Sequence, residues 1–401
     1  MSTATAIQAI GRPIDGPQNL GRALDDLLAT ATDTEPPALL ALGEPTHGIA
    51  AFPLLRNEVL AHLVERGYRS IVLETDHFAA SIVDDYVCGA ATEIDTVLAT
   101  GFSHGFGAVP GNRELVEWLR AHNAARAPAD RVRFHGFDAP VEYAGAPGPR
   151  HALSRAADRL PAALRPESAS ELDELAGEDA DWTNPAAMYD PAASIGNSPR
   201  AHALRLLADD LASALHRASP GLRPADPAAY DRAVSYARTA QGLLRYHAAM
   251  ATDTPDRIDI VLSLRAEMMA DNLLAVIAQE QHRGPSLVFA HNAHVNPAHD
   301  DAESWANAGA LVHMTLADRY LFVATDASPD PDPNTLQHSL AAATPHCTLF
   351  PAPPLRAALP PSTGTSTPIV PGHIPLTPAD LSGAAAVVFI TDTDGKRHRY
   401  W

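Results

Sequence analysis

Lysine is almost absent from the chain. Of its 29 basic residues, 28 are arginine and only Lys396 is lysine. A Walker phosphate-binding loop needs a lysine between glycine and serine or threonine, but Lys396 is followed by Arg397. Pyridoxal-phosphate enzymes and protein kinases also depend on an active-site lysine. Because the single lysine lies close to the last residue, we exclude all three kinds of chemistry.

Positive charge is scarce overall. Lys and Arg total 29 against 48 Asp and Glu, which gives a formal net charge of −19 at pH 7. Such an acidic chain repels the phosphates of nucleic acids and of anionic membranes. Neither is therefore expected as a partner.

Cysteine and long apolar runs are lacking as well. Cys88 and Cys347 are the only cysteines, too few for a disulfide framework, and they form no C-x-x-C motif. No run approaches 18 consecutive apolar residues, and the first residues show neither the basic nor the apolar region of a secretory signal. We therefore expect a cytoplasmic protein that does not span a membrane.

Strand and helix patterns alternate along much of the chain. With 401 residues, 46% of them hydrophobic, it can bury a large core. Short apolar runs predict buried strands at 38–42, 70–73, 131–136, 286–290, 320–325 and 385–391, with helices between the first three. This alternation is typical of an α/β fold with a largely parallel central sheet flanked by helices.

The middle of the chain has a different pattern. Helical spacing dominates residues 151–283, and we expect a helical insertion there that forms the active-site cleft. Residues 1–150 and 284–401 are expected to form the N-terminal and C-terminal parts of the α/β core. The latter part includes a surface excursion, rich in Pro, Ser and Thr, over residues 327–380.

Ionisable side chains follow four of the predicted strands. They are Glu44, His47, Glu74, Asp138, His291 and His294. The carboxyl ends of parallel strands meet at one edge of a sheet, where α/β proteins bind their ligands. Burying such groups without partners is costly, so their coincidence at one edge predicts a functional site.

Two further residues are candidates for the site. Arg56 comes one to two helical turns after the loop of Glu44 and His47, and its guanidinium could hold a carboxylate or a substrate oxygen. His104 lies in GFSHG at 101–105, which matches the G-x-S-x-G motif of serine hydrolases. That motif requires a strand before it and a helix after it, whereas residues 94–99 resemble a helix end and 106–112 a loop. We therefore reject Ser103 as a nucleophile.

These residues resemble the erythromycin esterase family. The signature loop is LGEPTHG at 42–48, and AHNAHV at 290–295 matches the family's A-H-N-x-H motif. Supporting matches follow in the same order: Arg56, IVLET ending at Glu74, DDYVCG at 84–89, WLRAHN at 118–123, HGFD at 135–138 and RAEMMADNL at 265–273. The sequence departs from the family pattern at Ala51, where an acidic residue is frequent, and at Phe106, where tryptophan is common.

The resemblance implies hydrolysis of an ester, best known for the macrolactone of erythromycin and hence for macrolide antibiotic resistance. It also implies a histidine general base, which falls on His47, with Glu44, Arg56, Glu74, His291 and His294 around it. The candidates for binding substrate are Asp138, His104 and Arg265.

The chemistry of these residues agrees with that implication. A histidine with a pKa near 7 is suited to deprotonating water, and a carboxylate, Glu74 or Glu44, can hold its tautomer. Arg56 and one histidine of the A-H-N-x-H motif can stabilise an oxyanion, and the other histidine can protonate the leaving alkoxide.

Other interpretations of the same residues remain open. The five His and Glu side chains could bind Zn²⁺, Mn²⁺ or Fe²⁺. We nevertheless expect no metal or other cofactor, because Pro45 makes the E-x-x-H stretch a loop and a nearby arginine repels a cation. The site could instead perform an acid–base rearrangement, cyclisation or elimination in natural-product biosynthesis. A non-catalytic metal- or haem-binding protein is the third alternative. The expected partner is a small hydrophobic natural product, and the sequence carries no signal for an oligomeric state.

Overall fold

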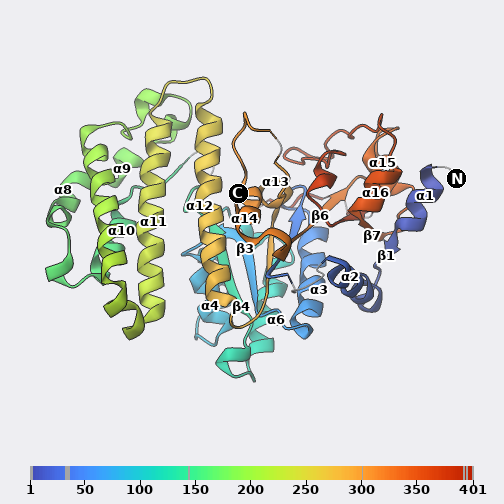
Figure 1. The fold of residues 1–401 in the computed structure, drawn as a ribbon, viewed down its shortest axis with the longest axis horizontal. Coiled ribbons are helices and arrows are strands. Elements are labelled where there is room, and N and C mark those ends of the chain that lie inside the picture. The colour runs from blue at the N-terminus through green and yellow to red at the C-terminus, as the bar shows by residue number, and fades with distance from the viewer. Residues whose placement is uncertain are drawn as a thin grey trace. The chain divides into compact units, whose positions relative to one another are not determined.

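A mostly parallel sheet organises the chain (Figure 1). The computed structural model describes residues 3–31, 37–142, 145–299, 301–391, 393 and 396–399. Within these residues, eight strands form one sheet in the order β1-β7-β8-β6-β2-β5-β3-β4. The strands span Arg12–Pro13 (β1), Leu39–Glu44 (β2), Ser70–Asp76 (β3), Arg133–Asp138 (β4), Ser286–His291 (β5), Tyr320–Ala327 (β6), Cys347–Pro351 (β7) and Ala386–Ile390 (β8). All six predicted strands are present.

The pairing of the strands confirms the predicted fold class. β2 pairs in parallel with β5 and β6, β3 pairs in parallel with β5, and β6 pairs in parallel with β8. β7 is antiparallel to both of its neighbours, β8 and β1. The chain therefore has an α/β fold whose sheet is largely parallel and is flanked by helices.

Helices bury the central strands, which is why these strands read as continuous apolar runs. Every residue of β2 and β5 is buried. The flanking helices include α1 (Thr3–Ile10), α2 (Pro17–Ala31), α3 (Ala51–Glu65), α4 (Ala80–Val87), α5 (Ile94–Thr100), α6 (Asn112–Asn123), α13 (Asn292–Val295) and α14 (Ala308–Leu316). α3 contributes Phe52, Leu60 and Leu63 to the main hydrophobic core. The packing fixes the carboxyl ends of the parallel strands at one edge.

The predicted surface excursion over 327–380 is only partly correct. It contains β7, whose Leu349 and Phe350 are completely buried, together with helices α15 (Leu336–Ala341) and α16 (Ala352–Ala358). The five-residue strand was missed because its short apolar run is surrounded by proline, serine and threonine, whose composition dominates the pattern.

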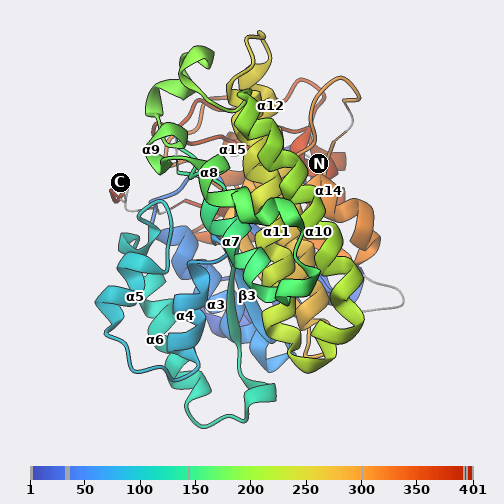
Figure 2. The ribbon, with the colours of Figure 1, turned by 90° about the vertical axis from the view of Figure 1, so that its left-hand side faces the viewer.

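The chain divides into two compact units. One combines Met1–Phe137 with Leu273–Trp401, and the other is Asp138–Asn272. The second unit contains α7 (Arg150–Arg159), α8 (Leu172–Ala176), α9 (Asp179–Trp182), α10 (Pro199–Ala225), α11 (Pro227–Met250) and most of α12 (Arg257–Glu280). Figure 2 shows α7, α10 and α11 side by side. The helical spacing predicted for this region is thus confirmed. Among the described helices, none is long and apolar enough to cross a membrane.

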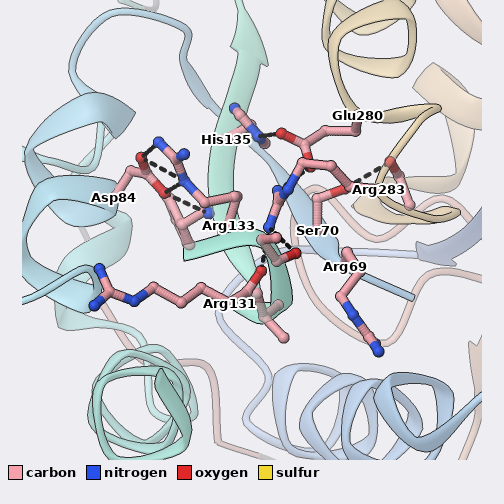
Figure 3. Close-up of polar contacts among 12 residues, drawn as sticks. Arg69, Ser70, Asp84, Arg131, Arg133, His135, Glu280 and Arg283 are labelled. Carbon is pink, nitrogen blue, oxygen red and sulfur yellow. Dashed lines mark hydrogen bonds and ion pairs between the residues drawn. The ribbon is translucent and has the colours of Figure 1, made fainter. Parts of the chain in front are cut away.

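Ion pairs and a side-chain hydrogen bond hold the edge strand β4 (Figure 3). Asp84 of α4 accepts the backbone N–H of Phe134 at 3.0 Å and also binds the Arg133 guanidinium. Burial raises the pKa of Asp84, but Arg133 outweighs this effect and lowers the pKa overall. His135 on the same strand lies 3.1 Å from Glu280 at the end of α12. An edge strand with occupied N–H groups is a poor template for pairing with another chain.

Candidate active site

The carboxyl ends of β2, β5 and β3 lie side by side. These strands are neighbours in the sheet, and their register pairs Glu44 with His291 and Leu73 with Phe289. Glu74 comes directly after Leu73 on β3. The structure therefore brings together acidic and imidazole side chains from positions far apart in the sequence.

His47 lies between two carboxylates. Its Nδ1 is 2.8 Å from Glu44 Oε1, and its Nε2 is 3.6 Å from Glu74 Oε1. The loop that carries His47 turns at Gly48. The φ of Gly48 is +84°, which is unfavourable for residues with a Cβ. The ring of Phe106 packs beside the imidazole with a centroid separation of 4.8 Å. The His47 side chain remains 20% exposed, so a reactant can reach it.

The charges of this group shift one another's pKa values. Burial lowers the pKa of His47, but the charges of Glu74 and Glu44 outweigh burial and raise it to about 10. Burial raises the pKa of Glu74, yet His294 and His47 bring it well below its usual range. The pKa of Glu44 is raised because burial outweighs its contact with His47. The resting site therefore holds an imidazolium at His47 beside an ionised Glu74.

Glu74 also contacts both histidines of the A-H-N-x-H motif. Its Oε1 is 3.3 Å from His294 Nε2, and its Oε2 accepts the backbone N–H of His291 at 2.8 Å. The His294 side chain is 26% exposed. Glu74 thus joins the strand end of β5 to the imidazole of His47.

His291 uses both ring nitrogens on the backbone. Nε2 donates to the carbonyl of Pro45 at 2.9 Å, and Nδ1 accepts the N–H of Ala293 at 3.1 Å. These two contacts fix the Nε2–H tautomer. Burial, together with the charge of His47, lowers the pKa of His291 to about 3, so the ring is neutral. The arrangement gives His291 the task of holding the loop that carries His47.

Asn292 explains why glycine precedes Glu44. Its Nδ2 donates to the carbonyl of Thr325 on β6, and Thr325 Oγ1 donates to the carbonyl of Gly43. A Cβ on Gly43 would lie 2.1 Å from Asn292 Oδ1. The signature loop and the A-H-N-x-H motif therefore depend on each other sterically.

Arg56 is a buried cation, only 1% exposed. Its guanidinium donates to Asn112 Oδ1 at 2.8 Å, to the carbonyl of Gly111 at 3.0 Å and to Asn57 Oδ1 at 2.8 Å. It also lies over the Phe289 ring, 5.0 Å from the centroid. Burial lowers its pKa to about 9, so it is still charged at neutral pH. Since these contacts occupy much of its hydrogen-bonding capacity, its charge is its main contribution to the site.

A cavity of about 30 Å³ adjoins these groups. Its polar lining comes from Glu44, His47, Arg56, Glu74 and Asn112, and its apolar lining includes Phe102, Phe106, Val109 and Phe289. Glu44 Oε2 is buried and has no hydrogen-bond partner among the described residues. A space of 10–15 Å³ holds one water molecule, so the cavity can hold water beside this oxygen.

The three residues predicted to bind substrate occupy different surroundings. The ring of His104 lies 5.3 Å from that of Phe106, the same ring that packs beside His47. In the helical unit, Arg265 forms a two-point ion pair with the completely buried Asp138, at 2.9 and 2.6 Å. Substrate binding by these three residues stays a prediction.

Ser103 has a structural task. Its Oγ accepts the N–H of Asp76 at 2.9 Å, and its backbone N–H donates to Thr75 Oγ1 at 2.7 Å. Helix α5 precedes this segment, as predicted, instead of the strand that a nucleophile elbow requires.

Sequence reasoning missed Asn112 and the contact of Phe106 with His47. Asn112 begins α6 after Gly111, and Glu114 lies in the first helical turn. That pattern could have located the start of a helix. It carries no information on the contact with Arg56, which is 56 residues away.

The His and Glu side chains of this site are the possible ligands of a metal ion. Among the described residues, no set of three or more His, Cys, Asp and Glu side chains is arranged to hold a metal ion. His291 also has no ring nitrogen left for a metal ion, since both of its ring nitrogens bind the backbone.

Sequence and fold comparisons identify the family of the chain. The family model of erythromycin esterase matches residues 63–329, more than half of the chain. The chain therefore belongs to the erythromycin esterase family, and at the level of the family it is an esterase-like hydrolase. The matched region includes Glu74, His291 and His294 but begins after the Glu44–His47 loop and Arg56. A search of curated proteins finds no match to the sequence.

Solved structures with the same fold cover almost the whole chain. A Bacillus cereus protein has a TM-score of 0.72 at 16% identity, with 97% of this chain and 96% of that chain covered. A histidine-to-asparagine variant of the erythromycin esterase EreC, in its open conformation, has a TM-score of 0.68 at 16% identity, covering 96% and 95%. A succinoglycan biosynthesis protein has a TM-score of 0.64 at 14% identity, covering 97% and 96%. At these identities the likeness concerns the fold.

Proposed function

We propose that the protein hydrolyses a carboxylic ester of a hydrophobic natural product, with His47 as the general base. The observation that carries the proposal is the position of His47 between Glu44 and Glu74 at the wall of a cavity with an apolar lining. A macrolactone is the substrate type suggested by the erythromycin esterase family.

Glu44 orients the base. With Nδ1–H donated to Glu44 Oε1, the other ring nitrogen, Nε2, is left to accept a proton from water. Nε2 and Glu74 Oε1 are 3.6 Å apart, too close for a water molecule between them, but a water to one side of the pair can contact both atoms. Removing its proton generates the nucleophile for the ester carbonyl, and Glu44 stabilises the imidazolium that forms.

His294 is the histidine that we assign to the substrate. Its side chain is 26% exposed and its Nε2 lies beside Glu74, whereas His291 is bound to the backbone through both nitrogens. His294 can donate a hydrogen bond to the oxyanion and then a proton to the leaving alkoxide. The Arg56 charge contributes to the electrostatic field of the site without a direct contact to substrate.

The proposal is tested with ester hydrolysis in ¹⁸O-labelled water after removal of metal ions by chelation. Purified protein is incubated with a 14-membered macrolide and with aryl esters of short and long acids, and the products are analysed by mass spectrometry. A gain of one labelled water, lost in His47→Ala, supports the proposal. His282→Ala is the matched control because His282 is exposed and is absent from the site.

Three outcomes would contradict parts of the proposal. Retention of hydrolysis by His47→Ala would reject the base assignment. A changed product without labelled oxygen would indicate the alternative of a non-hydrolytic rearrangement or elimination in natural-product biosynthesis. Recovery of activity only after adding a divalent metal ion would replace the histidine base by metal-activated water.

A further inference from the structure

Asn112 connects two walls of the His47 cavity. It is the first residue of α6 and is 5% exposed. Its Oδ1 accepts a hydrogen bond from Arg56 Nη1 at 2.8 Å, and its Nδ2 donates to the carbonyl of Phe106 at 2.7 Å. Both ends of one buried amide are therefore used on residues that line the cavity.

The helix start does not need this amide. Gly111 precedes α6, and its N–H is taken by the carboxylate of Glu114 at 2.8 Å. The Asn112 side chain instead reaches back across the loop. The Asn112 side chain therefore contacts residues around His47 and does not cap the helix.

The two partners of Asn112 lie near different members of the His47–Glu44 pair. The Phe106 ring is 4.8 Å from the His47 ring, so the position of its backbone limits the rotation of the imidazole. Arg56 is a buried cation on the same cavity as Glu44, whose Oε2 has no hydrogen-bond partner among the described residues. Other ionisable groups near His47 are Glu74, His291 and His294, and Arg397 Nε donates to the His47 carbonyl at 3.3 Å.

We propose that Asn112 is a positioning residue for the His47–Glu44 pair. Its carbonyl oxygen fixes the charge of Arg56 on the Glu44 side of the cavity, and its amino group fixes Phe106 against His47. The inference rests on the proposed function, because it assigns Asn112 to the general base of that reaction.

Two substitutions separate the contacts. Asn112→Ser is too short to reach either partner, whereas Asn112→Asp keeps the oxygen toward Arg56, loses the donor to Phe106 and adds a negative charge. Both residues are favourable in the first turn of a helix, so both variants are expected to fold.

The expected results differ between the two variants. Asn112→Ser lowers kcat by about tenfold, with KM within about twofold, because a loosened base is misplaced while substrate binding persists. In Asn112→Asp, the added negative charge also cancels the field of Arg56. Loss of this positive field favours protonation of the His47–Glu44 pair. The acid limb of its kcat/KM profile therefore moves to higher pH by ~0.5–1 unit.

Asn123 on the same helix provides the matched control. It is 1% exposed and binds the carbonyls of Val87 and Val132, far along α6 from Asn112. Asn123→Leu is expected to lower Tm without moving the pH profile. An Asn112→Asp profile that coincides with that of the unmodified protein, or an equal loss of kcat in Asn123→Leu, would overturn the proposal.

A second readout does not depend on turnover. Histidine ring signals are titrated by NMR in the unmodified protein and in Asn112→Asp, with His47 assigned from its loss in His47→Gln. An upward shift of the His47 midpoint supports the proposal, and an unchanged midpoint refutes it. The NMR titration can be carried out even if no ester is hydrolysed. Failure of the proposed reaction and failure of the positioning role are therefore distinguishable.

Discussion

Glu74→Gln tests the electrostatic control of His47. The substitution keeps the shape of the side chain but removes the negative charge 3.6 Å from His47 Nε2. The resting enzyme must release a proton from His47 before the ring can act as a base, because Glu74 and Glu44 raise its pKa to about 10. In the unmodified protein, kcat/KM therefore rises with pH through neutrality toward that value.

The size of the shift follows from the separation of the charges. Two unit charges at this distance attract by about 4–5 kcal/mol at an effective dielectric constant of about 20, equivalent to about 3 pH units. Solvent reaches the 20% exposed His47 and weakens part of this attraction. We therefore expect the acid limb in Glu74→Gln to move to lower pH by about 2 units.

The assay is a kcat/KM profile from pH 5 to 11 on an ester found by the substrate panel, supported by NMR titration of His47. Glu280→Gln is the matched control, because Glu280 is also a buried glutamate paired with a histidine, His135, in a separate cluster. Its profile should match that of the unmodified protein. An acid limb that stays in place or moves to higher pH in Glu74→Gln would refute the reasoning.

Three further predictions concern steric fit, the buried ion pair and metal dependence. Gly43→Ala should cost about 2–4 kcal/mol in thermal unfolding, because the new Cβ displaces Asn292. Gly221→Ala, which has open space around it, should be neutral or stabilising. Arg265→Met should cost about 3–5 kcal/mol, because it leaves the buried Asp138 carboxylate unpaired. A raised KM with unchanged Tm would instead assign Arg265 to substrate binding. Prolonged chelation should leave kcat/KM unchanged, and restoration of lost activity by Zn²⁺ or Mn²⁺ would show a metal requirement.

The parts of the site at strand ends were predictable from the sequence. Buried parallel strands are continuous apolar runs, so the residues at which β2, β3 and β5 end could be read within a few positions. Parallel pairing then requires these ends to share an edge. Glu44, Glu74 and His291 lie together for this reason. The order of the strands, which makes β5 the neighbour of both β2 and β3, has no comparable signal in one sequence.

The surroundings of Arg56 were harder to predict, although one signal was present. Arg56 lies four residues after Phe52 and four before Leu60, on the face of α3 that is buried. An arginine at such spacing must find partners inside the protein. Two of its partners, Asn112 at the start of α6 and the carbonyl of Gly111, are 55 residues or more away along the chain, and long-range contacts of this kind are fixed only by the tertiary fold.

The balance of charge is the reason why we expect the site to need no metal ion. Glu44 and Glu74 are two acids, and they face two cations, the imidazolium of His47 and the guanidinium of Arg56. A divalent cation placed among them would meet an added repulsion from Arg56 unless His47 lost its proton. His291 could ligate only by giving up its contacts with Pro45 and Ala293, which hold the loop of the base. The same hydrogen bonds that orient His47 therefore oppose conversion of the cluster into a metal site.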